Sequence, residues 1–133
     1  MDQYGPLTSK VIAYQDTVVK LVPTAKEPTD WAPLGEFIAI DEFERAGPFL
    51  DVQDWVGYTE MIQGWAGSIQ GFETTVRRVA ELEHRVYFEV EERHRYGHDW
   101  LVVNSMNVFE FNDDGKVCHL DVYLQSPPPS AAG

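Results

Sequence analysis

Apolar residues in the first part of the chain recur at helical spacing. Val11, Tyr14 and Val18 are separated by three and four residues, so they share one face of an amphipathic helix. Pro23 follows this series and cannot continue a helix, because it lacks a backbone N–H. The pattern predicts a helix over residues 8–22.

A short second helix and a strand are expected next. Trp31, Leu34 and Ile38 have the spacing of one helical face, and good N-cap residues stand directly before them. Beyond this segment the chain favours an extended conformation. We therefore expect a strand over residues 40–46.

Two aspartates mark the start of a third helix. Asp51 and Asp54 lie three positions apart, which resembles a capping box that satisfies the free N–H groups of a first helical turn. Gly47-Pro48 breaks the chain before them. The glycines over residues 64–67 are expected to end this helix.

From Phe72 onward the apolar period changes to two, which is typical of strands with one buried face. Turn residues at 96–99 and 112–115 separate consecutive segments, as expected for hairpins. The predicted strands are residues 72–82, 85–95, 100–111 and 116–125.

This order of elements predicts an α+β fold for a single domain over residues 1–125. Three N-terminal helices would pack on the concave side of a curved antiparallel sheet. The resulting cone would enclose a pocket, and an aromatic-lined cone suits a small molecule. Residues 126–133 contain three consecutive prolines and are expected to form a disordered tail.

Composition and charge exclude several functional classes. The 133 residues are 44% apolar, which is enough for one hydrophobic core. Cys118 is the sole cysteine and no nucleotide-binding motif occurs, so we expect no disulfide, metal site or cofactor. Ten basic and 22 acidic residues give a net charge of −12, which repels nucleic acid and anionic membranes. Without a long apolar run or a signal segment, we expect a cytoplasmic protein.

The closing part of the chain carries a family resemblance. Phe109-Glu110-Phe111 precedes an Asn-Asp-Asp-Gly turn, and Lys116-Val117 opens the last strand. With the order of elements over residues 8–125, this resembles the nuclear transport factor 2-like superfamily, in its SnoaL-like and ketosteroid-isomerase-like branch. The resemblance implies a homodimer. It also implies either isomerase, dehydratase, cyclase or epoxide hydrolase chemistry, or binding without catalysis.

The resemblance places isomerase positions on this chain. Asn107 stands where ketosteroid isomerases have the aspartic acid that donates a hydrogen bond to the developing enolate. An amide can donate the same hydrogen bond. Ala46 falls at the general base of these isomerases and carries no proton chemistry.

The resemblance places the catalytic residues of limonene-epoxide-hydrolase-like members at Val90, Glu92 and Val122. Of these three, only Glu92 is a carboxylate. A slip of one residue in the last strand would exchange Val122 for Asp121. Strand alternation, independently of any family, puts His94 on the same face as Glu92. This pair is the best acid–base candidate in the sequence.

Each candidate has a structural alternative. Asn107 lies beside Phe109 on an inward face, where it either contacts a ligand or satisfies a backbone group in the core. Glu92 and His94 either face the pocket or emerge into solvent before the turn. The residues expected to bind the ligand are Tyr14, Tyr58, Met61, Trp65, Phe88, Trp100, Phe109 and Val122.

The preferred hypothesis is a cofactor-independent enzyme that acts by proton transfer on an apolar cyclic metabolite, such as a steroid, terpenoid or polyketide. Glu92 and His94 would move the proton, and Asn107 would hold a substrate oxygen. The alternative is a non-catalytic ligand carrier or a dimeric assembly module of the same fold.

Overall fold

Helix α1 (Pro6–Leu21) starts and stops at prolines in a computed structural model that describes residues 4–127. Pro6 occupies the first turn, where no N–H is needed, so the helix begins earlier than residue 8. The helix ends just before Pro23, close to the predicted end. Val11, Tyr14 and Val18 are buried, as their spacing predicts.

The second helical segment, η1 (Pro28–Glu36), is a 3₁₀-helix and not an α-helix. Pro33 lies inside it and cannot donate the backbone hydrogen bond of an α-helix. Trp31 and Leu34 are spaced by three residues and are completely buried. The tighter winding keeps both side chains on the core side.

Helix α2 (Trp55–Ala66) begins after one of the two predicted capping aspartates. The Asp54 carboxylate accepts a hydrogen bond from the backbone N–H of Gly57 at 2.9 Å, which makes Asp54 the N-cap. A two-residue strand, β2 (Val52–Gln53), lies directly before it and was not predicted. Two residues are too few to show an alternating pattern.

Six strands form one sheet in the order β2-β1-β6-β5-β4-β3. The remaining strands are β1 (Glu44–Ala46), β3 (Gly71–Leu82), β4 (Arg85–Tyr96), β5 (Asp99–Phe111) and β6 (Val117–Gln125). Strands β3 to β6 agree closely with the predicted ranges, including both hairpin turns.

The sheet is mixed and not antiparallel throughout as predicted, because β1 pairs in parallel with β6. The first strand is also shorter than the predicted 40–46. The N–H of Glu42 donates to the carbonyl of Ala39 at 3.1 Å, so the chain turns before β1. Ile38 makes a separate parallel bridge to Val117.

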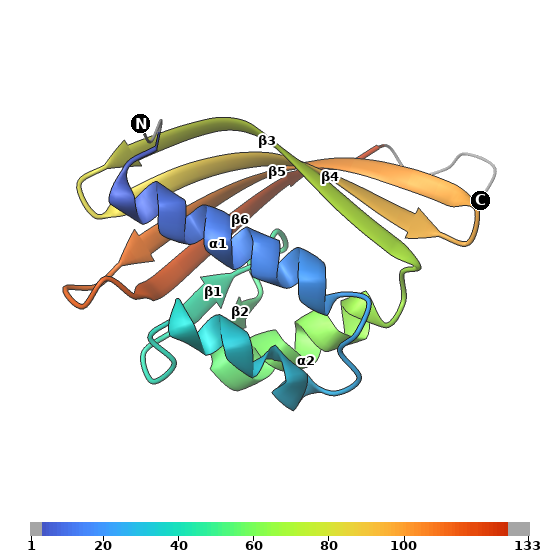
Figure 1. Ribbon diagram of the computed structural model, residues 1–133, viewed down its shortest axis with the longest axis horizontal. Coiled ribbons are helices and arrows are strands. Elements are labelled where there is room, and N and C mark those ends of the chain that lie inside the picture. Colours follow the sequence, from blue (N-terminus) through green and yellow to red (C-terminus); the bar gives the residue numbers. More distant parts are fainter. Residues whose placement is uncertain (1–3, 128–133) are drawn as a thin grey trace.

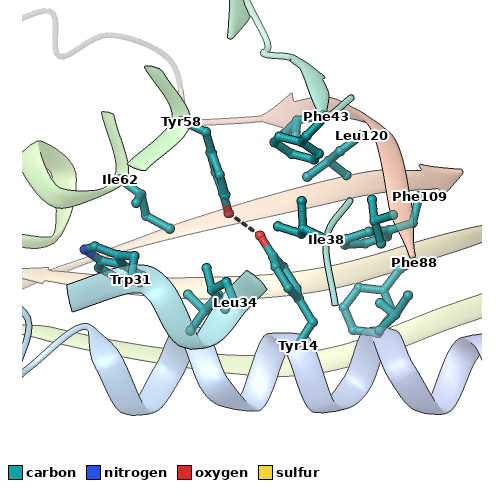
Figure 2. Packing of buried hydrophobic residues seen from close by; sticks show 14 of the residues in the cluster. Tyr14, Trp31, Leu34, Ile38, Phe43, Tyr58, Ile62, Phe88, Phe109 and Leu120 are labelled. Carbon is teal, nitrogen blue, oxygen red and sulfur yellow. Dashed lines mark hydrogen bonds between the residues drawn. The ribbon is translucent and has the colours of Figure 1, made fainter. Parts of the chain in front are cut away.

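The curved sheet lies over the helices (Figure 1). Helix α1 crosses under it and contacts β3 and β4, whereas α2 contacts η1 and β2. Between the layers is a core of buried apolar side chains that includes Phe88, Phe109 and Leu120 (Figure 2). This confirms the predicted fold of helices packed against a curved sheet.

The Asn112–Lys116 turn shows why the closing motif suits its place. The Asn112 side-chain oxygen accepts hydrogen bonds from the N–H groups of Asp114 and Lys116, each at 3.0 Å. Gly115 has a φ of 74°, a left-handed conformation that glycine adopts without strain. The turn therefore directs β6 back along β5.

Two further predictions concern the C-terminal tail and the absence of a membrane-spanning segment. Most of the predicted tail, residues 128–133, lies outside the residues that the structure describes. Within residues 4–127, the helices are all too short or too polar to cross a bilayer.

Candidate functional site

A cavity of about 490 Å³ lies between the concave face of the sheet and the helices. Both layers contribute to its wall, which is mostly apolar. Among the residues predicted to act chemically, Glu92, His94 and Asn107 all line it. Six of the eight predicted ligand-binding residues line it as well: Tyr14, Tyr58, Met61, Trp65, Phe109 and Val122.

The other two predicted pocket residues lie elsewhere. Phe88 has the expected parity but is fully buried in the core, against the ring of Phe109 (Figure 2). Trp100 has the opposite parity to the cavity-lining Leu101. It is 47% exposed, and the Arg95 guanidinium lies 6.0 Å from its ring centre.

The register of β6 decides between Asp121 and Val122. Val122 lines the cavity and is paired with Asn107. Asp121 is on the opposite face, where its carboxylate lies 2.9 Å from Nε2 of His119. The one-residue slip considered from the sequence does not occur.

Glu92 and His94 form a hydrogen-bonded pair on β4. His94 Nε2 lies 2.9 Å from Glu92 Oε1, and the two side chains are only 11% and 18% exposed, respectively. The imidazole packs against the rings of Trp65 and Phe72, each with centres 5.3 Å away. The pair is therefore held at the cavity wall and does not emerge into open solvent.

The Tyr14 and Tyr58 hydroxyl groups hydrogen-bond to each other across the gap between α1 and α2 (Figure 2). Burial is the main cause that raises the pKa of both phenols, and for Tyr14 the rise is large. Both are therefore protonated at neutral pH. Since the shared bond uses one proton, the second phenol proton is available to an acceptor in the cavity.

Two polar residues on β5 share the cavity face. Asn107 Nδ2 donates a long, 3.4 Å hydrogen bond to the carbonyl of Phe88, so its amide is held but not fully used. Ser105 is buried, and its hydroxyl has no partner among the residues that the structure describes. Ser105 was missed as a candidate, although it has the same parity as Asn107.

Arg45 on β1 is a further polar cavity residue that the sequence did not reveal. Its Nη1 donates to Oε1 of Gln53 at 2.9 Å, and its Cζ lies 5.6 Å from the Tyr58 ring centre. Phe43 is buried, whereas Arg45 lines the cavity and Glu44 points away to His119 at 3.2 Å.

Metal-binding geometry is absent from this part of the molecule. Within residues 4–127, no group of three His, Cys, Asp or Glu side chains is arranged to hold a metal ion.

The sequence matches no family model and no curated protein. Solved structures do match it. An NTF2-like protein from Anabaena variabilis has a TM-score of 0.75 at 16% identity, over 96% of each chain. The chain has the nuclear transport factor 2-like fold.

Two further structures with this fold carry functional names. IdmH from Streptomyces antibioticus, assigned as a polyketide cyclase, has a TM-score of 0.70 at 12% identity, over 91% of this chain and 93% of that one. An LEH-like epoxide hydrolase from M. tuberculosis has a TM-score of 0.64 at 14% identity, over 88% and 84%. These likenesses confirm the fold that the resemblance implied.

Proposed function

We propose that the protein is a cofactor-independent enzyme that acts by proton transfer on an apolar cyclic metabolite. The Glu92–His94 pair carries this proposal, because a carboxylate bonded to an imidazole stands at the wall of a mostly apolar cavity. Such a pair can accept a proton from one substrate atom and return it to another. Isomerisation, dehydration, cyclisation and epoxide opening all need such a transfer.

In the proposed reaction, Glu92 accepts the proton and His94 holds the carboxylate in place. Removal of a proton next to a carbonyl moves negative charge onto the carbonyl oxygen. Asn107, Ser105 and the spare phenol proton of the Tyr14–Tyr58 pair are donors on the same cavity and suit this oxygen. These donors are held before the substrate arrives, so little reorganisation is needed.

The named neighbours support this reaction class but do not select one member of it. One is assigned as a polyketide cyclase and another as an LEH-like epoxide hydrolase. Both reactions start from a largely apolar molecule and need proton movement. A steroid, terpenoid or aromatic polyketide would suit the cavity chemistry equally well.

A second candidate function is non-catalytic binding of the same kind of ligand. It is favoured by the apolar residues at positions where relatives carry out chemistry. Ala46 aligns with the isomerase base, and Val90 and Val122 align with two of the three epoxide hydrolase positions. A ligand carrier needs the cavity without the proton transfer.

A ligand screen followed by product analysis separates the two functions. Thermal unfolding would be followed with steroids, terpenoid epoxides, aromatic polyketides and fatty acyl compounds. A ligand at 100 times its Kd adds about 2.7 kcal/mol to stability. We expect one class to raise Tm and to yield an isomeric, dehydrated or hydrated product by mass spectrometry. A rise in Tm with unchanged ligand would establish a carrier instead.

A further inference from the structure

An arginine that lines the cavity has no carboxylate to neutralise it. Arg45 is partly buried on β1, and no ion pair within 4.0 Å is found for it among residues 4–127. Its one side-chain hydrogen bond goes to the neutral amide of Gln53. A guanidinium has five N–H donors, so most of them stay available.

Two acidic residues close to Arg45 in the chain have other direct partners. Glu44 pairs with His119 on the other face of the sheet. Asp51 also lines the cavity, but it is exposed, and its carboxylate accepts from the Phe49 N–H and the Gln53 amide. The chain has 22 acidic and ten basic residues, so a cavity arginine without a direct acidic partner is a favourable local position for an anion.

Arg45 and Glu92 carry opposite charges on the wall of the same cavity. Arg45 lowers and Glu92 raises the pKa of both Tyr14 and Tyr58, so the tyrosine pair lies within the field of both charges. The strand order places β1 three strand positions from β4. At about 4.8 Å per strand, the two residues are offset by roughly 14 Å across the strands. The register adds a second offset along β4, because Arg45 lies in line with Val86, six residues before Glu92.

We propose that Arg45 is the carboxylate-binding subsite of this cavity. The ligand is then an acid, with an apolar cyclic body and one carboxylate remote from the atom on which Glu92 and His94 act. The carboxylate accepts two hydrogen bonds from the guanidinium fork, while the body lies against Phe109, Leu120 and Val122. This inference rests on the proposed function and names its substrate class.

A matched pair of fluorescent probes tests the subsite. Pyrenebutyric acid and 4-(1-pyrenyl)butanol have the same apolar body and differ in the carboxylate. In the unmodified protein at neutral pH, we expect the acid to bind at least ~10-fold more tightly than the alcohol, as for a charge-assisted hydrogen bond. In Arg45→Gln the two probes should bind within about twofold of each other.

Arg85→Gln is the matched control. Arg85 is exposed at the start of β4 and does not line the cavity, and its substitution changes the net charge by the same amount. This variant should keep the preference for the acid. Equal binding of both probes to the unmodified protein would overturn the subsite, as would a preference that persists in folded Arg45→Gln.

A second measurement does not depend on how well Arg45→Gln folds. The Arg45 Nε–H resonance, assigned by its absence in Arg45→Lys, should shift on adding the acid and not on adding the alcohol. An Arg45 Nε–H chemical shift that does not change on adding the acid contradicts the proposal. Failure of both probes to bind would reject the subsite together with the ligand cavity, whereas loss of the acid preference alone leaves proton transfer by Glu92 in place.

Discussion

Tyr14 and Tyr58 lie 44 positions apart in the chain and share a hydrogen bond between their hydroxyl groups, one from α1 and one from α2 (Figure 2). The bond joins the two helices at the wall of the cavity. Among residues 4–127, it also fixes the only phenols that line the cavity from the helical side. The packing of the helices and the shape of the cavity wall therefore depend on the same pair.

Tyr14→Phe and Tyr58→Phe should destabilise the protein in a coupled way. Each single change leaves one buried hydroxyl without its partner and should cost about 1–2 kcal/mol. The double variant should cost less than the sum, by ~1 kcal/mol, because the second change leaves no unpaired hydroxyl. Urea unfolding of the four proteins measures this. Additive losses would show that the hydroxyls do not interact.

The same tyrosine pair predicts that the folded protein becomes less stable at alkaline pH. Burial raises both pKa values above the ordinary value of about 10, so above that pH the native state binds more protons than the unfolded state. The stabilisation is complete below about pH 10 and is lost as the pH rises through the folded pKa values. Urea unfolding between about pH 9 and about pH 11 should show a falling free energy of unfolding. The Tyr14→Phe/Tyr58→Phe double variant should lose most of this slope, and an unchanged slope would place its origin elsewhere.

Asp54 should matter more for helix α2 than Asp51. Asp54→Ala removes the N-cap hydrogen bond to Gly57 and should lower the free energy of unfolding by about 1 kcal/mol. Asp51→Ala removes only longer, exposed contacts of 3.3 Å and should cost less. Thermal or urea unfolding ranks the two variants. The reverse ranking would argue that the capping assignment is wrong.

The homodimer implied by the resemblance stays a prediction. The face of β5 and β6 opposite the cavity carries exposed apolar side chains, among them Val102 and Tyr123. Sedimentation at micromolar concentration should give a dimer. Tyr123→Glu should shift the equilibrium towards monomer, because the dimer would have to bury the new carboxylate in its interface. A monomer of the unmodified protein at that concentration rejects this interface.

Local patterns in the sequence predicted the long strands because each strand carries its own alternation and its own turn residues. Leu101, Val103 and Ser105 lie on one face whatever the rest of the chain does. Glu92 and His94 were found for the same reason, since two positions on one strand share a face. The choice between Val122 and Asp121 on β6 stayed open in the sequence, and the pairing of β6 with β5 decides it.

Features that depend on distant partners were not predictable in this way. The parallel pairing of β1 with β6 joins segments about 75 residues apart, and three residues of strand have no clear period. The same lack of period hid the direction of Arg45. The Tyr14–Tyr58 bond and the enclosed position of Phe88 depend on how the helices close over the sheet.

Proton transfer by Glu92 is tested most directly with the variant Glu92→Gln. Its turnover is measured on a ligand from the class that raises Tm. The amide keeps the size of the side chain but cannot accept the proton, so kcat should fall at least ~100-fold while binding changes little. Glu60→Gln, an exposed change on α2 outside the cavity, should retain full turnover. Turnover by Glu92→Gln equal to that of the unmodified protein would contradict proton transfer by Glu92.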